Sequence, residues 1–424
     1  MSDSSGIENQ PESAADVSGF GGHPLRTLTV PAVAAGDSDG VTDALAEMGL
    51  EDCEQLLAAA AVPGVSTRLR DKLNLNAQAF KSLLQSARSG LPEERAALVS
   101  RPAPRDLGLG VRTPPADIIA AAEATAVDGE RQVLAPEAAA LAESINLISF
   151  MPPVRNQGSR GTCVAFALTA LNEYVLRRRG LGRNLSEQHL YYEIKLIDGA
   201  PNGCGTWQVR AVTALRDRGQ CREYIWPYNP NLPCNNHGAR PSTARSNGWK
   251  YRLNTFAVAA RSVAAYKTQL AMQRPVTLSI PVYDSWYQSN EVRRSGRITM
   301  RVGDEESSGG HAVITVGFQD SPSSPGGGYF MVRNSWSTGW AYESPYGAGY
   351  GTIPYQYITN DAWEAFSAVV PGVATEPDED ELVEDEALVD GLRTETLVRI
   401  KVGSNVEITI EDGRSDTAPG RVGG

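Results

Sequence analysis

The stretch Gln157-Gly158-Ser159-Arg160-Gly161-Thr162-Cys163 joins a glycine-rich loop to the start of a helical pattern. Apolar residues then recur at intervals of three and four, three arginines follow, and Gly180 ends the pattern. Cys163 therefore lies at the amino end of a predicted helix over residues 163–179, where the positive end of the helix dipole stabilises a thiolate. A thiolate attacks carbonyl carbon, which makes acyl transfer the natural reaction class. On position alone, a small buried core cysteine is an equally good interpretation.

Two later segments supply the groups that a reactive thiolate needs. Gly309-Gly310-His311-Ala312 puts an imidazole at the entrance of an apolar strand over residues 312–318, where it can act as a general base. Asn334-Ser335-Trp336 begins at the last residue of a second predicted strand, residues 329–334. The sequence around the other three histidines does not indicate catalysis. Structural roles are expected for His189 and His237, and His23 falls in the N-terminal residues predicted to be disordered.

With Asn202-Gly203-Cys204-Gly205, these segments in this order resemble the papain family of cysteine peptidases over residues 145–371. The resemblance implies an α+β fold of two lobes, one helical and one antiparallel and β-rich, which agrees with helical patterns first and strand patterns later. It implies four catalytic residues and one supporting residue: Cys163 as nucleophile, His311 as its base, Asn334 orienting the imidazole, Gln157 donating to the oxyanion, and Trp336 covering the His–Asn bond.

The resemblance also implies an extended peptide substrate, held in a cleft between the lobes by backbone pairing with a glycine-containing loop. The substrate-binding residues expected from it are Gly161, Gly203, Gly205, Ser279, Gly309 and Ala312.

The sequence departs from secreted members of the family in three ways. Arg160 stands where they have a disulfide cysteine, and Val164 replaces the usual tryptophan, which fits a disulfide-poor, bacterial-type, non-secreted member. Arg160 also suggests a cleft that favours acidic substrates. The E-x3-R-x3-F-x2-N pattern of the family's inhibitory propeptide is not found, so the N-terminal helices are not expected to be that inhibitor.

Five cysteines in a chain without a secretory signal argue against a disulfide framework. Cys204, Cys221, Cys234 and His237 do not have a standard zinc spacing. Ordinary thiols or one local disulfide are expected there, with no metal and no cofactor.

Outside the peptidase region, helical periodicity over residues 41–98 indicates a small bundle. Its Val62-Pro63-Gly64-Val65 turn faintly resembles a helix-hairpin-helix module, which binds DNA backbone or protein partners; a purely structural bundle is favoured. The predicted organisation is 1–40 disordered, 41–100 helical bundle, 101–144 linker with one helix near 116–126, 145–371 peptidase domain, 372–392 acidic linker, 393–412 β-hairpin and 413–424 disordered tail.

Charge and hydropathy narrow the classes of partner. No apolar run is long enough for a transmembrane helix, and residues 1–17 do not read as a secretory signal, so a cytoplasmic location away from membranes is expected. The net charge is -11, and residues 376–390 alone carry nine carboxylates. The rest is close to neutral, which argues against nucleic-acid binding.

The sequence thus predicts a cysteine-type endopeptidase that acts on protein or peptide substrates. Two alternatives stay open. In one, the bundle and the hairpin recruit a protein partner and the peptidase domain is an effector. In the other, the same cysteine transfers an acyl group or cleaves an isopeptide bond, a chemistry suggested by the terminal Gly423-Gly424.

Overall fold

The computed structural model describes residue 20 and residues 22–25, 38–125, 142–370, 396–402 and 406–412. Most of the predicted disordered start, the later part of the predicted 101–144 linker, the acidic linker and the tail lie outside the described residues. The described residues up to 370 form one compact unit, and the described residues from 396 onward form a second. In the described part of the chain, no helix combines the length and the apolar character that crossing a membrane requires.

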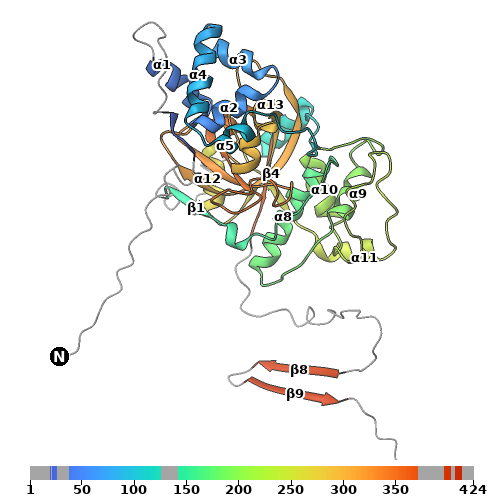
Figure 1. The fold of residues 1–424 in the computed structure, drawn as a ribbon. Coiled ribbons are helices and arrows are strands. Elements are labelled where there is room, and N and C mark those ends of the chain that lie inside the picture. The colour runs from blue at the N-terminus through green and yellow to red at the C-terminus, as the bar shows by residue number, and fades with distance from the viewer. Residues whose placement is uncertain are drawn as a thin grey trace, which may run out of the picture. The chain divides into compact units, whose positions relative to one another are not determined.

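An antiparallel sheet forms the centre of the first unit (Figure 1). Its strand order is β2-β7-β3-β4-β5-β6, and β1 pairs with β4. Every residue of β3 is buried, because helices cover the sheet. The strands are β1 (Ser144–Asn146), β2 (Thr255–Ala257), β3 (Val276–Tyr283), β4 (Ser307–Asp320), β5 (Gly328–Arg333), β6 (Tyr350–Pro354) and β7 (Glu364–Ala368).

Helix α8 (Cys163–Arg178) is the core of a helical lobe that packs against the sheet. Its residues 163–176 are all buried, as expected for a helix that is apolar on nearly all sides. The lobe also contains α9 (Glu187–Lys195), α10 (Gln208–Asp217), α11 (Ala244–Gly248) and the short η4 (Trp249–Tyr251). The predicted α+β class, with a helical part and an antiparallel β-rich part, is confirmed.

Shorter elements complete this part of the fold and were mostly not predicted. They are α6 (Ala116–Thr125), η3 (Ile148–Phe150), α12 (Val263–Ala271), α13 (Asp284–Tyr287), α14 (Asn290–Ser295) and α15 (Tyr355–Asp361). The strand predicted at 312–318 is longer and begins five residues earlier, before the two glycines that precede His311.

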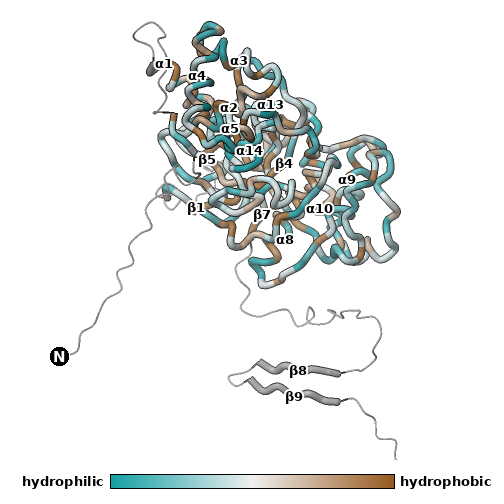
Figure 2. The backbone as a smooth tube through the Cα atoms, in the orientation of Figure 1, coloured by the Kyte–Doolittle hydropathy of each residue, from teal (hydrophilic) through white to brown (hydrophobic). Residues whose placement is uncertain are grey.

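Five short helices make up the N-terminal bundle (Figure 1): α1 (Ser38–Glu47), α2 (Cys53–Ala61), α3 (Val65–Lys72), α4 (Ala77–Ser89) and α5 (Glu93–Val99). Asp52 and Asn76 cap α2 and α4 by accepting backbone N–H groups. Hydrophobic and hydrophilic segments alternate along these helices (Figure 2), and the apolar ones form a core of their own, which Val302 joins from the peptidase region.

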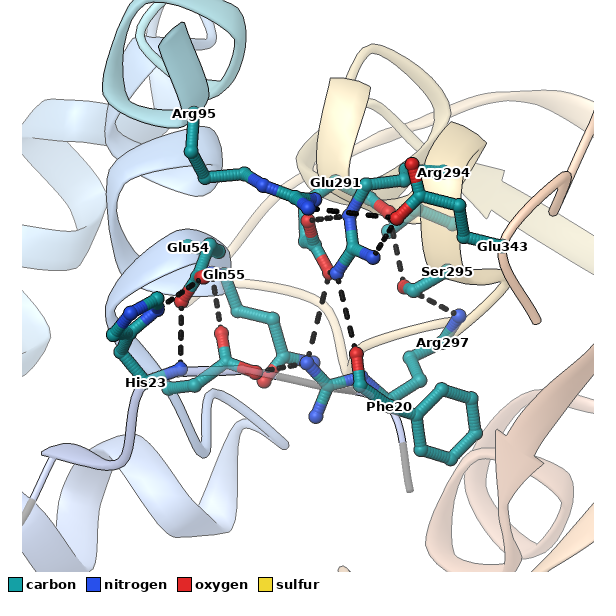
Figure 3. Close-up of polar contacts among 12 residues, drawn as sticks. Phe20, His23, Glu54, Gln55, Arg95, Glu291, Arg294, Ser295, Arg297 and Glu343 are labelled. Carbon is teal, nitrogen blue, oxygen red and sulfur yellow. Dashed lines mark hydrogen bonds and ion pairs between the residues drawn. The ribbon is translucent and has the colours of Figure 1, made fainter. Parts of the chain in front are cut away.

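The bundle packs against the peptidase region through buried ion pairs (Figure 3). Across this contact Arg297 pairs with Asp52, just before α2. Beside it, within the peptidase region, Arg294 in α14 pairs with the buried Glu291 and with the partly exposed Glu343. His23, in the segment predicted to be disordered, bonds Glu54 at 2.8 Å, and Phe20 and Leu25 are buried. The prediction of disorder is therefore wrong for these residues. Their polar sequence neighbours gave no sign that they would be anchored to the bundle.

In the second unit, β8 (Thr396–Val402) and β9 (Val406–Asp412) pair antiparallel, with Thr396 opposite Asp412 and Val402 opposite Val406. Both strands fall within the range 393–412 for which a hairpin was predicted.

Candidate active site

Cys163 is the first residue of α8 and is fully buried. Burial raises the pKa of its thiol to about 11, while hydrogen bonds from the backbone of Ala312 and Gly110 act in the opposite direction. Ala312 directly follows His311 in β4, so the sulfur lies at the same end of this strand as the imidazole. The glycine-rich loop and the strand thus bring together two residues that are distant in the chain.

Asn334 fixes the protonation pattern of His311. The Nε2 atom of the ring lies 2.8 Å from Oδ1 of Asn334, and the indole of Trp336 stacks on the ring with 4.2 Å between centroids. Because an amide oxygen can only accept, Nε2 carries the proton and Nδ1 of the neutral ring is left as a proton acceptor. Within the described residues Nδ1 has no hydrogen-bond partner. Burial lowers the pKa of His311 to about 4, and the bond to Asn334 opposes that shift.

Gln157 is held by both ends of its amide. Its Oε1 accepts from Oγ of Ser335 at 2.5 Å, and its Nε2 donates to the carbonyl oxygens of Arg160 at 2.8 Å and Gly108 at 3.0 Å. The Nε1 atom of Trp336 also donates to the Gly108 carbonyl, at 3.1 Å. Ser335 is therefore a positioning residue that sequence reasoning missed, although it stands between two residues that the resemblance singled out.

Residues 107–112, here called the cleft segment, run across this site. Gly110 and Val111 donate their backbone N–H groups to the carbonyl of Gly310, both at 3.0 Å. On the other side, Thr206 donates to the Gly110 carbonyl at 2.9 Å and accepts from Arg112 at 3.0 Å. The prediction that residues 101–144 form a linker is wrong for this stretch, because its backbone is paired on both edges.

The cleft segment has a defined direction. It enters beside Gln157 and Trp336, where the Gly108 carbonyl is bound, and leaves beside Thr206, with which Val111 pairs in parallel. The resemblance places an extended peptide substrate at the glycine-containing loop, so the segment lies where a substrate is expected.

The six predicted substrate-binding residues are distributed unevenly around the segment. A Cβ atom on Gly205 would lie 2.6 Å from the Gly110 carbonyl oxygen, and one on Gly309 would lie 3.1 Å from the Leu109 side chain. Gly161 lies against Gly110 in the same manner. Ser279 is opposite Ala312 in the β3–β4 register and is buried.

Two observations concern the glycine-containing loop. A Cβ atom on Gly203 would meet only Ala200 and no atom of the cleft segment within 4 Å. The residue whose N–H and C=O pair with the segment is Thr206, which the sequence did not single out. A residue that binds through its backbone gives no side-chain signal, and this explains why it was missed.

Arg160 does not face the cleft, and the expected bias toward acidic substrates is not supported. Its guanidinium is buried, donates to Gln188 at 2.7 Å and to the Asn229 carbonyl at 3.1 Å, and lies over the rings of Tyr191 and Tyr228. A planar cation with several donors can tie loops together. Arg160 therefore connects the loop before Cys163 to the helical lobe.

The cysteines follow one of the two predicted alternatives. Cys204 and Cys234 form a disulfide with a Cα–Cα distance of 4.8 Å, and Cys53, Cys163 and Cys221 are free and buried. His237 bonds the Pro201 carbonyl at 2.7 Å. Over the ranges that the structure describes, no three potential ligands gather into a group that could hold a metal ion.

A buried cysteine at a helix start, beside a histidine oriented by asparagine and a glutamine amide, defines a site built for thiol chemistry on carbonyl groups. Residues 142–353, half of the chain, match the family model of papain family cysteine proteases, and the chain belongs to this family.

Similar proteins cover the same region. The chain is 25% identical over 217 residues to an uncharacterized peptidase C1-like protein of Acanthamoeba polyphaga mimivirus, covering 49% of this chain and 65% of that protein. It is 29% identical over 207 residues to digestive cysteine proteinase 1 of Homarus americanus, covering 46% and 56%. The chain thus spans between about half and two thirds of the length of these curated relatives.

Among solved structures, xylellain, a cysteine protease from Xylella fastidiosa, is similar in fold. The TM-score is 0.51 at 24% identity, and the match covers 63% of this chain and 98% of that one.

The arrangement in which the cleft segment covers Cys163 and His311 is here called the closed form of the cleft. We expect this closed form to be most stable near neutral pH. His311 has a depressed pKa of about 4 against an ordinary 6.5, so its contribution to the closed form is lost as the pH falls from 6.5 through about 4. Cys163 has a raised pKa of about 11 against 9.0, so its contribution is lost as the pH rises through about 11. The pKa shift of His311 from 6.5 to about 4 corresponds to about 3 kcal/mol of stability of the closed form.

Hydrogen exchange at the amides of residues 110–112, corrected for its intrinsic pH dependence, measures this stability. Protection should decline on both sides of neutrality, and the Cys163→Ala protein should keep the acid decline and lose the alkaline one. A profile that is flat over the whole range would contradict the expectation.

Proposed function

We propose that this protein is a cysteine endopeptidase and that the closed form is its latent state. The observation that supports the proposal most is the Nε2–Oδ1 bond between His311 and Asn334, which leaves Nδ1 as the base for the thiol of Cys163. No carboxylate is required, because a thiolate and an imidazolium balance each other's charge once the thiol proton moves to Nδ1.

The reaction then follows acyl-transfer chemistry. The thiolate of Cys163 attacks the carbonyl carbon of the scissile bond, and the oxyanion receives hydrogen bonds from Nε2 of Gln157 and the backbone N–H of Cys163. The imidazolium of His311 gives its proton to the leaving amine, and the neutral ring later activates the water that hydrolyses the thioester. The bond from Ser335 keeps the nitrogen of the Gln157 amide directed at this position.

The path of the cleft segment supports an endopeptidase over an exopeptidase. The polypeptide enters beside Trp336, passes Cys163 and continues beyond Thr206 with its backbone paired, so neither end of the cleft is closed to a longer chain. Because Cys163 and His311 are both fully buried beneath the segment, a substrate reaches them only after the segment leaves.

The proposal is tested with the full-length protein, before and after incubation at about pH 4.5, where the closed form is weakened. We expect an epoxysuccinyl thiol inhibitor to label Cys163 and a peptide library to be cleaved internally. Gln157→Ala should lower kcat by about 10²-fold while labelling persists, because one oxyanion donor is lost. Cys163→Ala is the control without activity. Labelling of Cys163 without hydrolysis of any peptide, or no labelling at all, would contradict the proposal.

A role for the bundle in binding a protein partner, a cytoplasmic location and a bacterial-type origin stay predictions. The packing of the bundle on the peptidase region gives it a function within the chain, which does not require a partner.

A further inference from the structure

Both polar backbone atoms of Gly205 are bound by side chains from one helix. Its N–H donates to the hydroxyl of Tyr191 at 3.1 Å, and its carbonyl accepts from Nζ of Lys195 at 3.0 Å. Tyr191 and Lys195 are four residues apart in α9 and therefore lie on the same face of the helix. Helix α9 thus holds Gly205 at two points.

These two side chains are deeply buried, which makes the arrangement costly unless it is fully paired. Tyr191 and Lys195 are each 2% exposed. The Lys195 ammonium is matched by Asp198, with Nζ and Oδ2 2.6 Å apart. A buried charge without a partner would destabilise the fold by several kcal/mol. The buried ammonium of Lys195 bonds the loop residue Gly205 as well as Asp198. Because this burial is costly, we infer that Lys195 acts on the loop.

Gly205 directly precedes Thr206, the residue whose backbone pairs with the cleft segment. Its φ of 71° lies in the left-handed region, where a residue without a side chain is favoured. Once the N–H and C=O of Gly205 are fixed, the orientation of the next peptide unit follows, and Thr206 points its own N–H and C=O at Gly110 and Arg112. The disulfide between Cys204 and Cys234 restrains the residue just before Gly205.

We propose that Tyr191 and Lys195 are positioning residues that fix Gly205 so that Thr206 can bind the backbone of a peptide substrate. The guanidinium of Arg160, over the ring of Tyr191, links this pair to the loop that carries Gln157 and Cys163. The inference rests on the proposed peptidase function and names the elements that hold the substrate's backbone. It predicts an effect on substrate binding and little effect on the chemical step.

Tyr191→Phe is the most selective variant, because it removes one oxygen and keeps the ring. For a peptide long enough to reach Thr206, we expect KM to rise about tenfold with kcat within twofold, since one hydrogen bond to the loop is lost. A substrate with a single acyl residue, which does not reach Thr206, should show no change in KM. Lys195→Met combined with Asp198→Asn, which removes both charges of the pair, should raise KM for the long peptide at least as much.

Tyr174→Phe is the matched control. Tyr174 is also fully buried, and its hydroxyl donates to a backbone carbonyl, that of Gln273, at 2.9 Å. If both phenylalanine variants lose similar stability and neither changes KM, the role of Tyr191 is only structural and the proposal fails. A fall in kcat at unchanged KM would overturn it as well.

The closed protein gives a readout that does not depend on peptidase activity. The cleft segment uses the same Thr206 groups as the proposed substrate, so Tyr191→Phe should speed hydrogen exchange at the Thr206 amide and alkylation of Cys163 about tenfold. Tyr174→Phe should change neither rate. If the wild-type protein hydrolyses no peptide, the peptidase proposal fails, and unchanged rates in Tyr191→Phe would separately overturn the positioning role.

Discussion

Replacement of Gly110 by alanine will open the cleft, and Cys163 in Gly110→Ala will react with iodoacetamide at least a hundred times faster than in the wild-type protein. A Cβ atom at this position would lie 2.3 Å from the carbonyl carbon and oxygen of Gly161. Backbone atoms next to the nucleophile cannot yield as a flexible side chain would. The segment must therefore leave, losing backbone bonds worth roughly 1 kcal/mol each.

A second alanine substitution separates this effect from a general effect of losing glycine. A Cβ atom on Gly182 would have no neighbouring atom within 4 Å, and Gly182, like Gly110, is not in the left-handed region. Gly182→Ala should leave the alkylation rate of Cys163 unchanged. Mass spectrometry is needed to assign the modified residue, because Cys53 and Cys221 are also free. Equal rates in Gly110→Ala and the wild type would show that the segment does not control access.

The elements nearest the site were predictable because their patterns are long and regular. The helix predicted over residues 163–179 ends one residue earlier in the structure, since an uninterrupted apolar period and a glycine stop leave little freedom. The strands beside His311 and Asn334 were predicted for the same reason. Short elements such as α13 and α14, with four and six residues, carry too little periodicity to be found.

The cleft segment was missed because its bonding partners are far away in the sequence. Leu107-Gly108-Leu109-Gly110-Val111 alternates apolar residues with glycine, and glycine disfavours a strand by its own propensity. The partners at positions 158, 206 and 310 cannot be read from a local pattern. The alternating glycines were the available signal, because glycine within an extended stretch marks a close approach of another backbone.

The direction in which a side chain points was the second feature that the sequence could not predict. The motif identified Arg160 as a departure from the family but could not show that its guanidinium turns away from the cleft toward Tyr191 and Tyr228. Likewise, the polar and glycine-rich surroundings of His23 predicted disorder, whereas a single buried carboxylate, Glu54, anchors it. Both errors arise where a tertiary contact overrides the local pattern.

Arg297→Met should lower the free energy of unfolding by about 3–5 kcal/mol, because it leaves the buried carboxylate of Asp52 without its counter-ion. Arg297 pairs with Asp52, and its nitrogens lie 3.7 Å from Glu51 and 3.6 Å from Glu291. In Figure 3, it lies where the segment carrying Phe20 and helix α2 meet α14. Burial raises the pKa of Glu291, and Arg294 and Arg297 oppose this shift. Urea-induced unfolding measures the change.

The chain offers a matched control for this prediction. Arg68 in α3 also pairs the bundle with the peptidase region, through Asp304 at 2.8 Å, but both partners are exposed, at 38% and 90%. Exposed pairs contribute little, so Arg68→Met should change the free energy of unfolding far less than Arg297→Met does.

The charge argument also makes a prediction for the double variant. Asp52→Asn combined with Arg297→Met should recover part of the lost stability, because one of the unpaired carboxylates is removed. Residues 100–106 connect the bundle to the cleft segment, and in this connection Ala103 donates to the Gln288 carbonyl at 2.6 Å. Arg297→Met should therefore also speed alkylation of Cys163, whereas Gly110→Ala should leave the bundle packed. Equal stability losses in Arg68→Met and Arg297→Met would show that the buried cluster does not hold the bundle in place.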